Sequence, residues 1–288
     1  MTSQKIVPAR NWGQRMAATA LIAVVALLIF MVGSSRHITW SAIPQFLFDE
    51  TILDGIRLTI LFTVLSMVIS IVAGAILATM RLSPNPVLSG FASLYIWFFR
   101  GTPLLVQIIF WFNIQLFIPS IDIGSFHLDT NVIVTAFVAA LLALSLNEAA
   151  YMAEIIRGGL LAVDSGQHEA AKALGYTPAQ SMLRIIFPQA LRVIIPPIGN
   201  QTISMLKTTS LVSVVAAQDL LTRAQNIYAR NFLIIELLIV ASIWYLVMTT
   251  IASAAQYLIE HQLGKSTNQA PAIWRSALRL VRAEGRNG

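Results

Sequence analysis

Long uncharged stretches recur along the chain and are separated by short polar segments. A helix needs roughly 20 mostly apolar residues to cross the hydrocarbon core, because each residue adds about 1.5 Å along the axis. The pattern therefore predicts an all-α integral membrane protein with six transmembrane helices. The expected spans are 16–35, 58–80, 101–121, 130–147 with a helical continuation, 193–218 and 237–259.

Two apolar segments need a separate interpretation. The first span resembles a signal peptide, but its apolar run is longer than a typical signal-peptide core and no small-residue cleavage site is evident, which favours a retained helix. Residues 87–99 are apolar as well. Pro84, Asn85 and Pro86 leave this segment too short for a crossing of its own, so it is expected to be an interfacial helix.

Composition points to the bilayer as solvent. Hydrophobic residues make up 57% of the chain and charged residues 11%, whereas soluble domains carry about 25% charged residues. The chain has no cysteine, which excludes disulfides, thiolate zinc sites and cysteine nucleophiles.

The placement of the cations predicts the topology. Lys and Arg gather in the cytoplasmic loops of membrane proteins. With both termini in the cytoplasm, fourteen of the nineteen Lys and Arg residues lie inside, four lie outside, and Lys207 falls within a span. The net charge of +6 is thus explained by membrane orientation, and no nucleic acid partner is expected.

Three regions are expected along the chain. Residues 1–50 hold a cytoplasmic segment, an extra transmembrane helix and an outer loop, and residues 51–263 form the transmembrane domain. Residues 264–288 form a basic cytoplasmic tail, whose apolar positions would suit an interfacial helix on lipid or leave a solvated tail.

A polar loop, about 158–190, interrupts the apolar chain between the fourth and fifth spans. Asp164 or Ser165 can cap a short helix that reaches Leu174, and Gly175 can end it in the left-handed conformation. Thr177 and Pro178 start a second short helix, expected to end near 187–188. A loop that only connects two spans could be a handful of residues, so this structured loop predicts a docking partner.

The spacing within this loop resembles the EAA loop of ABC importer permeases. Glu169-Ala170-Ala171 is followed after three intervening residues by Gly175, after nine more by Ile185, and after two more by Pro188. The leucine usual before that proline is Phe187 here. The stretches FFRGTPLLVQ, YMAEIIRGGLLAVDSGQHEAAKALG and MLKTTSLVSVV are similar to the polar amino acid branch of these permeases, the His/Glu/Gln/Arg type, over about 51–260.

The resemblance implies a five-helix type I permease core in the bacterial inner membrane, with an additional N-terminal helix. It implies two cytosolic ATP-binding subunits that hold ATP and Mg, a second permease chain (identical or a sister), an extracytoplasmic amino-acid-binding protein and the lipid. The coupling contact to the ATPase would then be made by Gln167, His168, Glu169, Ala170, Ala171, Lys172, Gly175, Ile185 and Pro188. Glu169 would make a polar contact, the two alanines would allow close approach, Gly175 would set the elbow, and Ile185 and Pro188 would anchor the second helix.

Polar residues inside the apolar spans are candidates for the substrate path. Glu148 could face a water-filled path or partner a cation, and Lys207 could line a cavity or serve packing. Thr208 stands where the family commonly has Asp or Asn. The full candidate set is Asn113, Gln115, Glu148, Asn200, Lys207, Thr208, Thr209 and Ser210, with Gln201 as a further polar candidate.

Two further motifs favour structural roles. Glu154 and Arg157 lie three residues apart, so they can pair on one helix face. In Arg100-Gly101-Thr102-Pro103, threonine is expected to cap a helix that proline opens, with a gating role at the inner mouth as the alternative.

Several chemistries lack support in the sequence. The chain has no phosphate-binding G-x-x-x-x-G-K-[ST] loop, so no nucleotide cofactor and no ATPase activity of its own are expected. Its four histidines show no metal-ligand spacing, and no serine has the setting of a nucleophile elbow. The competing hypothesis is an ion-coupled secondary amino acid transporter, which would need intramembrane ion-coupling groups and no docking loop.

Overall fold

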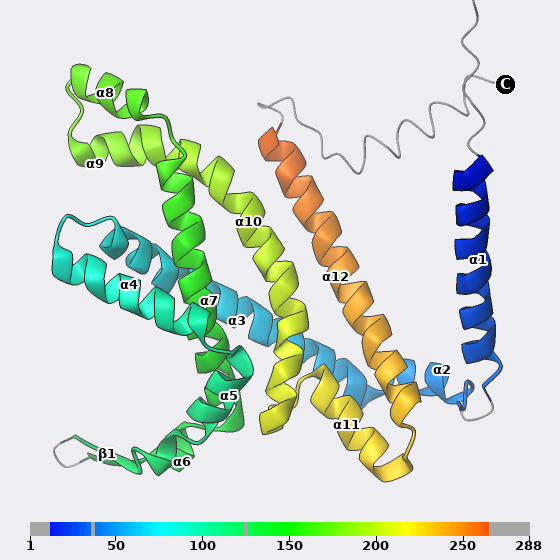
Figure 1. Ribbon diagram of the computed structural model, residues 1–288. Helices are drawn as coiled ribbons and strands as arrows, with labels where there is room; N and C mark the ends of the chain where they lie inside the picture. Colours follow the sequence, from blue (N-terminus) through cyan, green and yellow to red (C-terminus); the bar gives the residue numbers. More distant parts are fainter. Residues whose placement is uncertain (1–11, 36–37, 124–125, 265–288) are drawn as a thin grey trace, which may run out of the picture.

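The computed structural model describes residues 12–35, 38–123 and 126–264. This part of the chain is almost entirely helical (Figure 1). The first half contains α1 (Trp12–Gly33), α2 (Ala42–Leu47), α3 (Glu50–Arg81), α4 (Pro86–Gly101), α5 (Leu104–Phe112), the 3₁₀ turn η1 (Ile114–Leu116), β1 (Ser120–Ile123), β2 (Phe126–Asp129) and α6 (Thr130–Ile133). The second half contains α7 (Ala136–Leu161), α8 (Ser165–Ala173), α9 (Pro178–Ser181), the π turn η2 (Met182–Ile186), α10 (Phe187–Thr208), the 3₁₀ turn η3 (Thr209–Val215), α11 (Leu220–Asn231) and α12 (Ile234–Gly264).

The prediction of an all-α membrane protein is confirmed, and the predicted number of six spans is approximate. Within the described residues, four helical segments are long and apolar enough to cross a membrane: Glu50–Arg81, Ala136–Leu161, Pro178–Val215 and Ile234–Gln262. The pair α4 and α5 makes a fifth if it is counted as one bent span. The 22-residue α1 covers the first predicted span.

The third predicted span, 101–121, is wrong in its bounds. Helix α5 has only nine residues and ends at Phe112, after which η1 and the antiparallel hairpin β1–β2 follow. Helices α4 and α5 are long and apolar enough for a crossing only as a pair, and the pair bends by 101° between them. Segment 87–99 forms most of the 16-residue α4, which does not qualify as a span by itself, and its interfacial position stays a prediction.

Buried amides support the break between α4 and α5. Gln107 Nε2 donates to Phe99 O at 3.1 Å and to Thr102 Oγ1 at 2.7 Å, and Asn147 Nδ2 donates to Phe99 O at 2.8 Å. A break inside a membrane leaves backbone groups without water, so such side-chain partners are needed. Thr102 Oγ1 itself donates to Phe98 O, and Pro103 occupies the cap position of α5 without a side-chain bond. The prediction that Thr102 caps α5 is thus wrong.

The core lies between α3 and α7. Phe62 and Met67 from α3 pack with Leu144 and Met152 from α7, all nearly or fully buried. Gly74 allows the close approach, because an added Cβ would lie 2.4 Å from Met152 Cβ. These two helices form a frame against which α10 packs, and α12 packs against α10 and α11.

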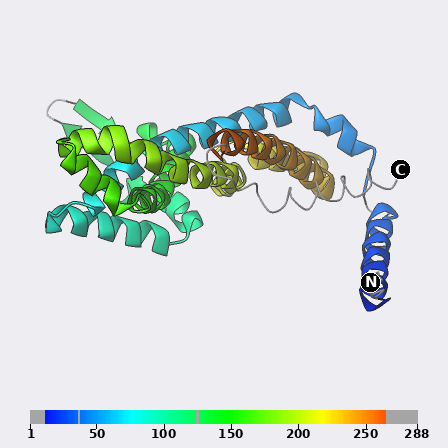
Figure 2. The ribbon, with the colours of Figure 1, turned by 90° about the horizontal axis from the view of Figure 1, so that it is seen from above.

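The N-terminal extension is attached to α12 through α2. Thr39 N donates to Glu236 Oε1 at 2.6 Å, and Trp244 Nε1 donates to Leu47 O at 2.7 Å. Helix α1 stands apart from the bundle, beyond α12 (Figures 1 and 2). The extension is thus tied to the bundle at the base of α1.

Candidate functional site

Helices α8 and α9 project together from one end of the molecule, where the start of α1 and the end of α12 also lie (Figure 1). Asp164 caps α8 by accepting from Gly166 N at 2.7 Å. Thr177 and Gln180 form a reciprocal capping box at the start of α9. The helix starts predicted from Asp164 and Thr177-Pro178 are therefore confirmed.

The turn between α8 and α9 requires Gly175. Its φ of +77° lies in the left-handed region, which glycine adopts at no steric cost. Gly175 N donates to Lys172 O and Tyr176 N to Ala171 O, which closes the end of α8. The elbow predicted at Gly175 is confirmed.

The exposed face of α8 differs from the expected one at a single position. Gln167, His168, Glu169, Ala170 and Lys172 are exposed, so a partner can reach them. Ala171 is fully buried. Only one of the two alanines can therefore lie in a partner's groove, and Ala171 instead lets α8 pack closely on its own chain.

The expected end of the second short helix at 187–188 is wrong. The helix continues from Pro178 to Val215 without interruption. The π turn η2 directly precedes α10 and joins it to α9. Pro188 lies in the first turn of α10, where its missing backbone N–H does not interrupt the helix. The loop is therefore mechanically continuous with a membrane span.

The anchoring contact also differs from the expectation. Ala190 is buried in a cluster with Ala78, Ile156 and Ile194, and Ile186 is buried as well, whereas Ile185 is half-buried and Pro188 is exposed. Gln189 Nε2 donates to Gln167 Oε1 at 3.2 Å and so links α10 to α8. The buried positions at this turn are therefore Ile186 and Ala190, which lie next to the predicted anchors in the sequence.

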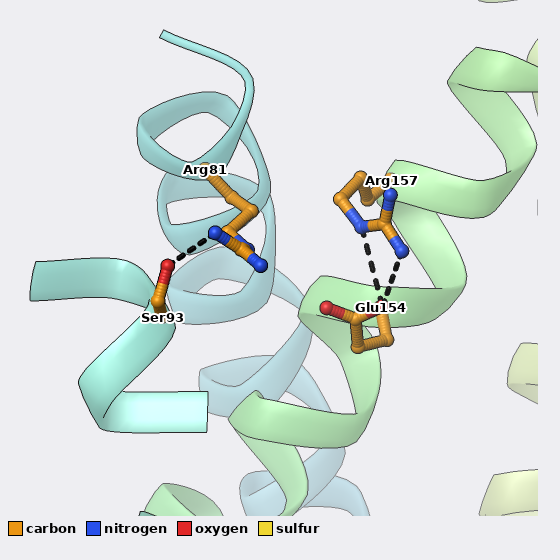
Figure 3. A network of polar contacts seen from close by, with 4 residues as sticks. All are labelled: Arg81, Ser93, Glu154 and Arg157. Atoms are coloured by element: carbon orange, nitrogen blue, oxygen red, sulfur yellow. Dashed lines mark hydrogen bonds and ion pairs between the residues drawn. The ribbon is translucent and has the colours of Figure 1, made fainter. Parts of the chain in front are cut away.

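Cations surround a single carboxylate near the ends of α3 and α7 (Figure 3). Arg157 donates to Glu154 Oε2 from Nε at 3.2 Å and from an amino nitrogen at 2.7 Å, so the predicted pair is confirmed. Arg81 donates to Ser93 Oγ of α4. Arg100 lies 5.2 Å from the ring centre of Tyr151. These contacts fix α4 against α3 and α7.

Glu148 lies buried in the interior of the bundle, and its partner is an amide rather than a cation. Gln201 Nε2 on α10 donates to Glu148 Oε1 at 3.0 Å. The pair joins α7 to α10, the helix that continues from α9 through η2. Gln201 was among the polar path candidates, but its sequence context did not identify this partner.

Lys207 faces an open groove of about 350 Å³. Lys207 and Ser210 line one wall, and the α12 residues Ser242, Tyr245, Leu246 and Thr249 line the other. The groove therefore places one ammonium beside the hydroxyl groups of Ser210, Ser242, Tyr245 and Thr249. It lies between the helix that continues from the loop and α12.

The other path candidates do not gather at this groove. Thr209 is fully buried and donates to Leu206 O, while Thr208 donates to Ser204 O. Asn113 donates to Ile109 O at the end of α5, where it closes that helix. Gln115 lies in η1, and Asn200 is exposed on α10. Lys207 and Ser210 are the candidates that the structure brings together.

A buried carboxylate that sequence reasoning missed lies at the far end of the bundle. Asp219 is fully buried and caps α11, accepting from Leu221 N and Thr222 N. It also accepts from Thr222 Oγ1 at 2.5 Å and from Tyr245 OH at 3.2 Å. Burial raises the pKa of Asp219 above its usual range, and the hydrogen bonds from Thr222 oppose that rise. The sequence does contain a signal for this cap, because Asp219 directly precedes the amphipathic segment that forms α11, and aspartate is a preferred N-cap residue.

Among the described residues, no three His, Asp or Glu side chains come together as a metal site. The helical membrane bundle and its projecting helix pair define a transport protein of the permease type. Residues 70–265 match the family described as binding-protein-dependent transport system inner membrane component. The chain belongs to this family, and the resemblance to ABC importer permeases is confirmed. The ATPase of such importers is provided by partner subunits.

Characterised relatives and solved structures agree with this assignment. The chain is 42% identical to the arginine transport system permease protein ArgU of Corynebacterium glutamicum, covering 96% of this chain and 88% of ArgU. It is 37% identical to the L-cystine transport system permease protein TcyB of Bacillus subtilis, covering 79% and 92%. A crystal structure of an amino acid ABC transporter with histidines has a TM-score of 0.65 at 37% identity, covering 74% of this chain and 94% of that one. The MetNI methionine ABC transporter in an inward-facing conformation shares the fold, with a TM-score of 0.57 at 18% identity.

Proposed function

We propose that this chain is the permease subunit of an ATP-driven importer of polar amino acids. The observation that carries the proposal is the continuous helix from Pro178 to Val215, which joins the projecting loop to the groove wall at Lys207. An ion-coupled transporter has no need of such a loop.

The exposed face of α8 is the docking element for the ATPase. Glu169 and Lys172 provide charged contacts, Ala170 leaves room for close approach, and Gly175 sets the angle between α8 and α9. A displacement of α8 is transmitted through η2 into α10, because Ala190 packs the start of α10 against Ala78 of α3 and Ile156 of α7. ATP and Mg are bound by the partner, and this chain has no cofactor of its own.

The substrate path includes the Glu148–Gln201 pair and the Lys207 groove. Lys207 is suited to the α-carboxylate that every amino acid carries, and the buried Glu148 carboxylate is suited to a cationic group. Arginine is the first substrate to test, because the similarity to ArgU covers 96% of the chain and so extends into the N-terminal extension.

The remaining partners complete the complex. A second permease chain, identical or a sister, lines the other side of the path, and an amino-acid-binding protein delivers the substrate from outside. The complex lies in the inner membrane with both termini in the cytoplasm. The location of α8, the start of α1 and the end of α12 at one end of the molecule supports this orientation.

Reconstitution tests the proposal. The chain is placed in vesicles with its ATPase and binding protein, and uptake of labelled L-arginine, L-cystine and L-glutamine is measured with and without ATP and with the ATPase omitted. We expect uptake only with ATP and the ATPase present. Uptake by the isolated chain without ATP would favour the ion-coupled transporter instead.

A further inference from the structure

Three helices meet at Asp219, the N-cap of α11, and α11 lies at the end of the bundle opposite α8 (Figure 1). We call this contact the outer joint. Thr59 of α3 accepts a hydrogen bond from Leu220 N at 3.1 Å, and Tyr245 of α12 donates to Asp219 at 3.2 Å. Thr222 of α11 donates to Asp219 from both its backbone and its hydroxyl group. The outer joint therefore fixes α3, α11 and α12 relative to one another.

Close backbone packing strengthens the same contact. An added Cβ at Gly55 would lie 2.8 Å from Leu220 Cα and 3.1 Å from Arg223 Cγ, so α11 lies directly on α3. Thr59 and Asp219 are fully buried. A buried polar group that loses its partner is destabilising, so these bonds resist separation of the three helices.

The segment before the joint is strained. Ala216 has a φ of 54° and Gln218 a φ of 63°, and neither residue is a glycine. Such residues persist in the left-handed region only where their surroundings hold them there, and they cluster where a structure switches. Here the segment 216–218 connects η3, the end of the helix that begins at Pro178, to the outer joint.

Tyr245 connects the joint to the groove. Its hydroxyl group points to Asp219, while its side chain lines the groove opposite Lys207 and Ser210. One groove wall thus belongs to the helices that the joint fixes. The other wall belongs to α10 and η3, which follow the coupling loop and end at the strained segment.

We infer that Asp219 is a positioning residue for this groove: it holds Tyr245 on the α12 wall, while the left-handed segment 216–218 is the pivot on which the α10 wall moves. The inference rests on the proposed function for the identity of the moving wall. It gives the two walls different roles, one fixed and one driven by the ATPase.

Distance measurements between spin labels test the pivot. The chain has no cysteine, so two introduced cysteines are its only labelling sites. One pair, Ser210→Cys with Ser242→Cys, spans the groove, and the other, Arg57→Cys with Ala229→Cys, spans the joint between α3 and α11. The labelled chain is diluted with unlabelled chain in the complex with its ATPase, without nucleotide and then with ATP and vanadate.

The expected result is a shift of the groove distance that exceeds the width of its nucleotide-free distribution, with an unchanged joint distance. A joint distance that shifts together with the groove distance, or a groove distance that does not change, would overturn the pivot. Neither result depends on uptake. Uptake by the Lys207→Gln variant decides separately whether the groove belongs to the path.

Single substitutions test the role of Asp219 itself. Tyr245→Phe removes only the hydroxyl group, and we expect it to broaden the nucleotide-free groove distance. Tyr228→Phe on α11 is the matched control, because no hydrogen bond of its hydroxyl group occurs in the described part of the chain. Asp219→Ala should broaden the distance as Tyr245→Phe does, because it removes both acceptor oxygens, Oδ1 that accepts from Thr222 and Oδ2 that accepts from Tyr245. Equal distributions for Tyr245→Phe and Tyr228→Phe would overturn the inference, even if Asp219→Ala fails to fold.

Discussion

Gln201 donates a hydrogen bond to Glu148 over 3.0 Å, and the two side chains come from different membrane-spanning helices, α10 and α7. A carboxylate in a membrane interior is costly, and it is usually retained for a function. The contact lies between a helix of the frame and the helix that continues from the coupling loop. Any motion of α10 relative to α7 must therefore change the surroundings of Glu148.

Glu148→Gln tests whether this carboxylate recognises a cationic substrate. The amide keeps the shape of the side chain and loses its charge, so we expect the KM for arginine uptake to rise about tenfold, which corresponds to about 1.4 kcal/mol. The thermal stability of the complex should stay unchanged. Glu236→Gln is the control, because Glu236 holds Thr39 at the far end of α12. An unchanged KM in Glu148→Gln would remove this residue from the path.

Gly175→Val tests the elbow of the coupling loop. A β-branched residue at a φ of +77° costs about 1–2 kcal/mol or more, so we expect the angle between α8 and α9 to change. The variant should insert into the membrane normally and lose most ATP-driven uptake. Gly158→Ala is the control, because an added Cβ there meets nothing within 4 Å. Wild-type uptake by Gly175→Val would contradict the role given to this turn.

Glu169→Ala tests the charged contact on the same surface. Glu169 is exposed on α8, so its loss should leave the fold intact. We expect normal membrane insertion, unchanged thermal stability and a strong reduction of uptake, measured together with ATP hydrolysis by the complex. Full transport would show that α8 docks without this carboxylate.

Gly74→Ala tests the packing of α3 on α7. The added Cβ would meet Met152 Cβ at 2.4 Å and Ala153 N at 2.9 Å, so the helices must move apart. Overpacking of this kind costs about 1–3 kcal/mol. The expected result is a lower melting temperature in detergent than that of Gly90→Ala, where the added Cβ meets nothing within 4 Å. Equal melting temperatures would mean that α3 and α7 are not in this contact.

Asp219 predicts a dependence of stability on pH. Because burial raises the pKa of Asp219, the protonated form is favoured in the folded state more than in the unfolded state. The stability from this shift is fully present below the unfolded pKa and is lost as the pH rises through the folded pKa. We expect the melting temperature of the wild type, relative to Asp219→Asn, to fall as the pH rises above about 4, the ordinary pKa of an aspartate. The opposite slope would contradict a raised pKa.

Local signals in the sequence predicted the loop well. Asp164, Gly175 and the Thr177-Pro178 pair act through their own backbone and that of near neighbours, so their effect can be read from the chain. The long apolar spans were recognised for the same reason. Length and composition identify a helix that can cross a membrane, but the apolar run 101–121 shows that they do not locate a break within such a run.

Contacts between distant segments could not be predicted in this way. Thr59 and Leu220 bond across 161 positions, and the hydroxyl group of Tyr245 reaches Asp219 from another helix. The break between α4 and α5 depends on Asn147, which comes from α7. Pro188 suggested a helix end because the π turn before it leaves no clear signal in the sequence.

Ala170→Cys tests the central claim, that the ATPase acts on this chain through the exposed face of α8. In a chain without other cysteines, this single cysteine is cross-linked to the ATPase subunit in the assembled complex, and ATP-driven uptake is measured before and after the cross-link is reversed. Ala171→Cys is the matched control, because Ala171 is fully buried. We expect Ala170→Cys alone to cross-link, with uptake blocked while the link is in place and restored on its reversal. A cysteine at 170 that never links to the ATPase, or that reacts only with reagents confined to the outside, would contradict the account.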